Sequence, residues 1–324
     1  MEIEHLAKKL SKSELVCLLA SIYGINEDID ALIERRLLSD KKATKAGDEE
    51  NIFLKQIRAI SQEDDFISYN ECPDFAFRLS ELLNDIDILL TDQDAKLALQ
   101  ATERFIGLID SVMERADDSN GELGDIFREA IAQWLGIAAR LREQEPDAEQ
   151  WVEKVLYFFD GNDYGCFDQV IADSGNLLTE QELRQLAWRF ENEAKQALAN
   201  KSNSRQYNSA AAHACIGLES VAEALEDMAL YEKATLLRSP QPNAMQMASI
   251  VEFALHIGDE ARAEYWLAQP GWEQRVYEKK QLINKLLEQQ GNVTQIKQNL
   301  LDEFQQHPTG HNLQQYLRLA DAEE

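Results

Sequence analysis

Apolar residues recur along most of the chain at intervals of three and four positions, the spacing that places them on one face of an α-helix. The first such stretch lies between residues 11 and 24. Ser11 and Glu14 have the spacing of a capping box, in which each side chain accepts a hydrogen bond from the other residue's backbone N–H. Gly24 suits the left-handed conformation that often follows a helix. A second helix is predicted over 26–37, after this tight turn.

The same helical spacing continues through most of the first 160 residues. Pro146 has the place of a first-turn proline for the last helix of this series. No run of alternating β-branched residues bounded by Asn-Gly or Asp-Gly turns occurs, so no strand is predicted. The stretches 41–50 and 61–74 are predicted to be connections. The helices are predicted over 49–60, 75–90, 94–112, 126–138 and 146–159.

The last third of the chain repeats one arrangement. Gly258 and Gly291 lie 33 residues apart, and each follows an apolar helix and opens a second helix that ends near a proline. A fainter copy ends at Pro240. Residues 209–317 therefore resemble tetratricopeptide-like repeats, whose period is about 34 residues, although the full consensus pattern is missing. Helical-hairpin repeats outside the strict tetratricopeptide class fit the same residues.

These patterns predict an all-α protein built as a right-handed helical-hairpin repeat array, an α-solenoid of the TPR or HEAT kind. The composition agrees, because 14 Gly and 6 Pro in 324 residues are too few for the turns of a β-sandwich or barrel. The length suggests two domains. We expect an N-terminal helical array over 1–200 and C-terminal TPR-like repeats over 201–324, joined by a polar linker at 201–208.

Acidic residues dominate the middle of the chain. The net charge is −27, and residues 61–200 contribute −20 of it, with 11 basic and 31 acidic side chains. A field of this sign repels phosphate, which disfavours direct binding of nucleic acid or of an anionic membrane. It favours a protein partner with a basic surface. The alternative interpretation is that the acidity only keeps the protein in solution.

No motif of catalysis is present. The chain contains no P-loop, no G-x-S-x-G and no G-x-G-x-x-G after a strand, so we expect neither an enzyme nor a bound cofactor. Its four cysteines, at 17, 72, 166 and 215, form no C-x-x-C pair, and no metal site is expected. The N-terminus lacks the apolar core of a signal peptide, and no apolar run approaches the ~18 residues of a membrane span. A cytoplasmic location is expected.

Two turns carry the candidate partner-binding residues. The first surrounds Asn120-Gly121, and its acidic side chains are Asp117, Asp118, Glu122 and Asp125. If Gly121 were position six of an EF-hand loop, positions one and twelve would be Ala116 and Phe127, which excludes that site. Three interpretations stay open: acids that favour the start of the next helix, an incidental cation site, and a surface for a basic partner.

The second turn follows a pair of phenylalanines and contributes Asp160, Asp163 and Tyr164. Acidic side chains beside aromatic ones suit a basic or peptide partner. A purely structural turn fits the same residues, because two glycines lie within six positions.

Residues 94–127, which include the first turn, resemble a family of bacterial helical proteins that carry a domain of unknown function. The turn at 163–165 is similar to a further part of that family. The resemblance implies an all-helical solenoid and no established activity. Related regions are sometimes found beside SWIM-type zinc fingers, but this chain has no C-x-C pair, so no zinc site is implied.

Together these features predict a protein-interaction scaffold or adaptor that receives a peptide or a helix on a solenoid surface. The alternative is an acidic inhibitor or immunity-type protein that neutralises a basic partner or mimics nucleic acid. Salt distinguishes the two, because a complex driven by charge weakens as ionic strength rises and an apolar contact does not.

Overall fold

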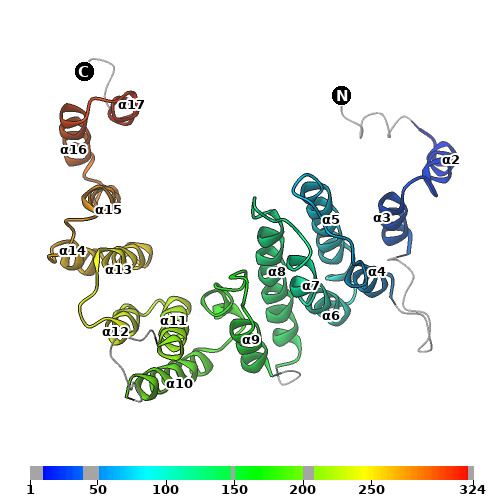
Figure 1. Ribbon diagram of the computed structural model, residues 1–324, viewed down its shortest axis with the longest axis horizontal. Coiled ribbons are helices and arrows are strands. Elements are labelled where there is room, and N and C mark those ends of the chain that lie inside the picture. Colours follow the sequence, from blue (N-terminus) through cyan, green and yellow to red (C-terminus); the bar gives the residue numbers. More distant parts are fainter. Residues whose placement is uncertain (1–9, 39–50, 147–149, 200–207, 320–324) are drawn as a thin grey trace. The chain divides into compact units, whose positions relative to one another are not determined.

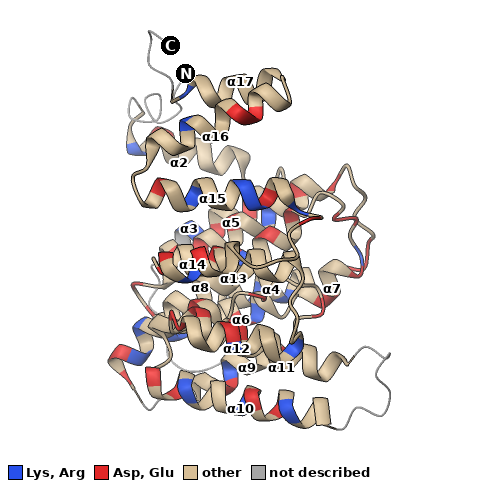
Figure 2. Ribbon diagram, turned by 90° about the vertical axis from the view of Figure 1, so that its left-hand side faces the viewer, with Lys and Arg blue, Asp and Glu red and all other residues tan. Residues whose placement is uncertain are grey.

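The computed structural model describes residues 10–38, 51–146, 150–199 and 208–319 (Figure 1). The regular elements in these ranges are all helices, and the one pairing of extended backbone there is an isolated parallel bridge between Ile67 and Ala116. The prediction of an all-α protein is therefore confirmed. Acidic and basic positions are interspersed along the helices (Figure 2). None of the helices described is long and apolar enough to cross a membrane.

The chain divides into two compact units, Met1–Thr179 (unit 1) and Glu180–Glu324 (unit 2). The linker predicted at 201–208 lies, apart from Asn208, outside the described residues. The division falls earlier than that linker because the helix over 180–199 packs extensively on the first helix after it.

Unit 1 is organised around one long helix. This helix, α8, packs against α5, α6 and η1. Its Trp134 is fully buried and meets Phe158 edge-on, with 4.9 Å between ring centroids, while the indole N–H donates to Glu103. The elements of unit 1 are α2 (Lys12–Ile22), α3 (Glu27–Leu38), α4 (Ile52–Ser61), α5 (Cys72–Leu90), α6 (Ala95–Ile106), α7 (Ile109–Met113), α8 (Glu122–Gln144), α9 (Trp151–Asp160) and the 3-10 helix η1 (Ala172–Asn176).

The start of unit 1 follows the sequence closely. The capping box is present, with the Ser11 N–H donating to Glu14 at 2.7 Å and the Glu14 N–H donating to the Ser11 hydroxyl at 3.3 Å. Gly24 has a φ of +87°. Farther on, the prediction that Pro146 opens a helix is wrong. Pro146 follows the end of α8, where a residue that does not continue a helix is common, and α9 begins at Trp151.

Buried charges join α3 to the rest of unit 1. Asp85 of α5 is fully buried and pairs with Arg35 at 2.6 Å and with Arg36. Arg35 also donates to Gln56 of α4 at 2.8 Å, and Gln56 donates to the carbonyl of Ala31. Three helices therefore share one polar cluster, whose partners satisfy a carboxylate that would otherwise be costly to bury.

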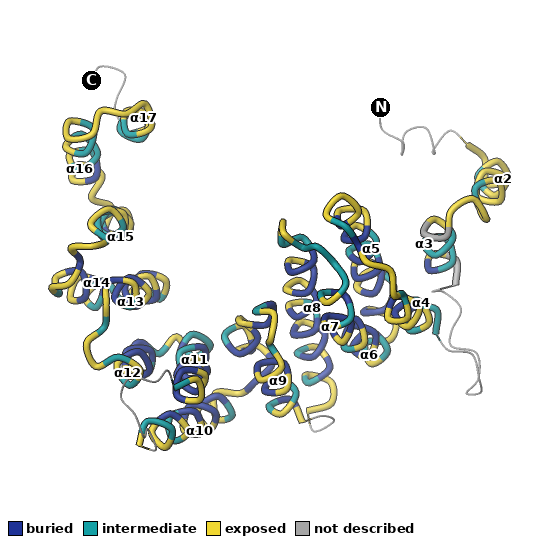
Figure 3. Tube along the Cα trace, in the orientation of Figure 1, coloured by how far each residue is buried: buried dark blue, intermediate teal, exposed yellow. Residues whose placement is uncertain are grey.

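Unit 2 is a succession of helices that pack mainly against their neighbours in the chain. The closest approach is between α10 and α11, where a Cβ added at Gly217 would lie 2.6 Å from the Phe190 ring. Burial decreases toward the C-terminus, and α17 has no buried residue (Figure 3). The helices are α10 (Glu180–Ala199), α11 (Ser209–Ala224), α12 (Met228–Arg238), α13 (Ala244–His256), α14 (Glu260–Leu267), α15 (Val276–Gln289), α16 (Val293–Gln306) and α17 (Gly310–Leu317).

Three turns in unit 2 share one geometry. Glu226, Gly258 and Gly291 have φ values of +51°, +77° and +68°. Each is followed by an Asp or Asn that caps the next helix through its side chain. In each turn the backbone N–H of that capping residue also donates to a carbonyl five residues earlier, at 2.8–2.9 Å. The turn thus ends one helix and starts the next within two residues.

Candidate functional site

The acidic turn predicted from the sequence connects α7 to α8. The Asp118 carboxylate accepts hydrogen bonds from the backbone N–H groups of Leu123 and Gly124, at 2.9 and 3.0 Å. It therefore satisfies two donors that the start of a helix leaves unpaired. Burial, together with the charges of Asp118 and Glu122, raises the pKa of the nearby Cys72 thiol to about 11.

The other acids of this turn also act within the molecule, with one exception. Asp117 accepts from the backbone N–H and the hydroxyl of Ser119, and Asp125 pairs with Arg128 one helical turn later. Glu122 is half-buried, and its Oε2 has no hydrogen-bond partner among the described residues. The turn thus has a structural explanation for three of its four carboxylates.

The second predicted turn is held by Asn162. Its carbonyl oxygen accepts from the Phe167 N–H at 2.8 Å, and its amide donates to Asp168 at 2.6 Å. Asp163 and Tyr164 are exposed at the tip of the turn. Asp160 lies at the exposed C-terminal end of α9 and takes part in an interaction of its own.

The structure brings the two turns together. Burial raises the pKa of the Cys166 thiol beside the second turn, and the charge of Asp118 from the first turn contributes to the rise. Burial likewise raises the pKa of Tyr164, with further contributions from Glu114 and Asp110 of the α7 segment. The two α7 acids were not among the predicted residues. We call Asp110, Glu114, Asp163 and Tyr164 the acidic surface.

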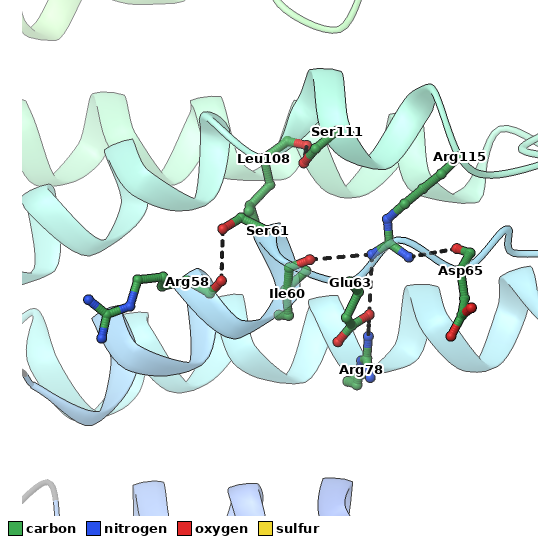
Figure 4. Close-up of polar contacts among 9 residues, drawn as sticks. All are labelled: Arg58, Ile60, Ser61, Glu63, Asp65, Arg78, Leu108, Ser111 and Arg115. Atoms are coloured by element: carbon green, nitrogen blue, oxygen red, sulfur yellow. Dashed lines mark hydrogen bonds and ion pairs between the residues drawn. The ribbon is translucent and has the colours of Figure 1, made fainter.

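A polar cluster fixes the backbone that leads into the first turn (Figure 4). The Arg115 guanidinium donates to the carbonyls of Asp65 and Ile60, at 3.1 and 3.5 Å, and to the Glu63 carboxylate at 3.2 Å. Arg78 of α5 donates to the same carboxylate at 2.7 Å. The predicted connection at 61–74 is thereby docked on the end of α7, where Ile67 forms its bridge with Ala116.

Unit 2 carries a groove that sequence reasoning missed. Two adjoining hollows, of about 520 and 450 Å³, are lined by α13, α15, α16 and the end of α17, and they share Lys285 and Glu288. We call them the α13–α17 groove. The residues used below are Glu252, Tyr277, Asn284, Lys285, Glu288 and Leu300.

The side chains of this groove are polar and accessible. Tyr277 is 51% exposed, and Lys285 is 3.5 Å from the Glu252 carboxylate on the neighbouring helix. Asn284 accepts a hydrogen bond from Asn299 of α16 at 2.9 Å. Lys285 and Glu252 lie 33 residues apart, the same interval as Gly258 and Gly291. That interval was the signal from which the groove could have been found.

Neither a metal-ligating cluster nor a bonded pair of cysteines occurs in the described ranges. No three His, Cys, Asp or Glu side chains there are placed to hold a metal ion. Cys72, Cys166 and Cys215 are buried as free thiols, and Cys17 is an exposed one.

The model of one protein family, described as a family of unknown function (DUF6880), matches residues 7–324. Comparisons with curated proteins and with solved structures find no match.

Proposed function

We propose that this chain, which belongs to the DUF6880 family of unknown function, is a protein-interaction scaffold that receives a peptide or a helix in the α13–α17 groove. The observation that carries the proposal is the pair of adjoining hollows that share Lys285 and Glu288. Successive helices of unit 2 contribute to one continuous surface, which is how helical arrays bind extended partners.

The three matching turns support an array of helical hairpins. Left-handed residues at 226, 258 and 291 recur at intervals of 32 and 33 residues, close to the tetratricopeptide period. In such an array equivalent positions of successive hairpins fall side by side. The ion pair between Glu252 and Lys285 joins two such positions. We therefore propose that α11 to α16 form three hairpins of this class.

The chemistry of the groove suits a peptide backbone with mixed side chains. The amide of Asn284 and the hydroxyl of Tyr277 offer hydrogen bonds, and Leu300 offers an apolar contact beside them. Lys285 and Glu288 give the groove charges of both signs. A partner would therefore be recognised by hydrogen bonds and shape more than by net charge.

The test begins with selection of peptides on the full chain from a phage-displayed library. The affinity of the selected peptides is then measured by fluorescence anisotropy. We expect Tyr277→Ala to weaken binding about fivefold or more, as a truncated interface anchor does. Tyr265→Ala is the matched control, because Tyr265 is similarly exposed, at 48%, but lies on α14 outside the groove. If no peptide is selected, or if both variants bind equally, the proposal is wrong.

A second candidate function is neutralisation of a basic partner through the acidic surface. The gathering of Asp110, Glu114 and Asp163 around Tyr164 favours it. In that case a lysine-rich peptide would bind less tightly as salt rises, and Asp110→Asn/Glu114→Gln/Asp163→Asn would lower its affinity and its salt dependence. Unchanged binding by this triple variant would contradict the second candidate.

A further inference from the structure

Unit 1 contains a groove that neither proposed function uses. It lies between α3, α4 and α5 and has a volume of about 550 Å³. We call it the α3–α5 groove. Its apolar lining comes from all three helices and includes Leu32, Ile60 and Leu82, while Phe77 stands at its side with 68% of its surface exposed. An aromatic side chain exposed to this degree beside an apolar hollow is a typical anchor for a partner.

The charged side chains of this groove differ in whether they have an ion-pair partner. Arg35 pairs with Asp85, and Glu63 pairs with both Arg78 and Arg115, so these groups are engaged in ion pairs within unit 1. Asp74 and Glu81 make no hydrogen bond or ion pair with any described residue. The charged groups of the groove that lack such a partner are therefore both carboxylates.

The two available carboxylates have a defined spacing. Asp74, Phe77 and Glu81 occupy positions i, i+3 and i+7 of α5 and line the same groove. Seven residues of an α-helix span about 10.5 Å, or two turns. A helix lying along α5 would meet this pattern with two cations two turns apart and an apolar side chain between them. The aromatic ring would then lie between the two ion pairs.

We propose that the α3–α5 groove binds a basic amphipathic helix of a partner protein. Apolar side chains of that helix enter the groove against Phe77, Leu32 and Ile60, and lysine or arginine side chains pair with Asp74 and Glu81. The site lies in unit 1 and shares no residue with the α13–α17 groove. The two proposals therefore stand or fall separately.

The test uses a fluorescein-labelled helical peptide of leucine and lysine, with lysines at i and i+7 on either side of its leucine face. Two further peptides replace every lysine by glutamate or every leucine by glutamine. Affinity for the full chain is measured by anisotropy at several salt concentrations. We expect only the leucine–lysine peptide to bind tightly, because the groove requires both the apolar face and the cations.

Variants of the groove locate the binding. Phe77→Ala is expected to weaken binding about tenfold, and Asp74→Asn/Glu81→Gln is expected to weaken it and to reduce its salt dependence. Tyr157→Ala, which truncates an aromatic of α9 that is 75% exposed, and Glu129→Gln/Asp173→Asn, which removes two exposed carboxylates elsewhere in unit 1, are the matched controls. Both controls should bind as the parent does.

Two outcomes would overturn the proposal. Equal affinity for the leucine–lysine peptide and its glutamine counterpart would show attraction by charge alone, and equal losses in the groove and control variants would place the peptide elsewhere. Thermal melting followed by circular dichroism shows whether each variant is folded, so that a loss of binding can be distinguished from a loss of structure. All of the substituted side chains are exposed or half-buried, so the melting temperatures should stay close to that of the parent chain.

Discussion

Unit 1 and unit 2 are both helical, but they bury their side chains in different ways. In unit 1, α8 packs against α5, α6 and η1, none of which directly precedes or follows it in the chain, and its Trp134 has no exposed surface. In unit 2 each helix packs mainly on its chain neighbours, and α15 buries only Leu282 and Leu286. This difference indicates that a core shared by helices that are not chain neighbours places much of the stability of unit 1 in one buried region. A stack of neighbours instead leaves one face of each helix open to a partner.

The largest effect on stability is expected when the buried Trp134 side chain of unit 1 is truncated. Trp134→Ala leaves a cavity and takes away the donor to Glu103, and we expect a loss of about 3–5 kcal/mol in the free energy of unfolding. Urea unfolding followed by circular dichroism measures it. Trp188→Ala is the control, because Trp188 of α10 is 71% exposed. It should change stability by less than about 0.5 kcal/mol. Equal losses would refute the contrast.

A smaller effect is expected at the tightest contact of unit 2. Gly217→Ala places a Cβ about 2.6 Å from the Phe190 ring, so the two helices must separate. We expect a loss of about 1–3 kcal/mol. Gly136→Ala in α8 is the counterpart, because no atom lies within 4 Å of the added Cβ. It should stabilise unit 1 by about 0.5–1 kcal/mol. Differential scanning calorimetry measures both, and a neutral Gly217→Ala would contradict the close packing.

The next largest effect on stability is expected at the acidic turn of unit 1. Asp118→Ala removes the acceptor of two backbone N–H groups and should lower stability by about 1 kcal/mol. Asp125→Ala removes an exposed ion pair and should cost only a few tenths. Chemical denaturation separates the two. If both substitutions are neutral, the capping role assigned to Asp118 is wrong.

The smallest free energies are expected for local opening of the helices at the end of unit 2, and they can be measured in the parent chain without any substitution. Because α17 has no buried residue and α16 buries only Ile296, these helices should open most easily. In hydrogen exchange followed by mass spectrometry, we expect their amides to exchange first, those of α13 later and those of α8 last. Uniform protection along unit 2 would mean that the stack opens as one cooperative body.

Local signals in the sequence predicted local structure well. The capping box at Ser11 and the left-handed Gly24 are where the pattern puts them, and Gly258 and Gly291 each lie between two helices as expected. The spacing of apolar residues gave a wrong helix boundary where the spacing continues across a turn of the backbone. The helix predicted over 94–112 is two helices, α6 and α7, because spacing alone does not show that the backbone turns at Gly107. No helix was predicted over 180–199, although Leu183, Leu186 and Phe190 of α10 have helical spacing.

The candidate site was predicted less well, for a physical reason. Composition located the acids of 117–125, but it does not distinguish Asp118, which accepts two backbone hydrogen bonds, from Glu122, whose Oε2 lacks a described partner. The α13–α17 groove was missed because its polar side chains resemble any solvated helix face. Only the packing of successive helices makes Glu252 of α13, Lys285 of α15 and Leu300 of α16 neighbours in this groove.

The shared geometry of the turns at Glu226, Gly258 and Gly291 has an evolutionary consequence. A segment of 33 residues that begins and ends at such a turn carries its own helix stop, its own helix start and both faces by which it stacks. In the hairpin array that we propose for unit 2, duplication or loss of one segment would therefore lengthen or shorten the unit while leaving the folding of every other hairpin unchanged. Relatives of this chain are expected to differ in length by multiples of about 33 residues, with the added segments inserted between these turns.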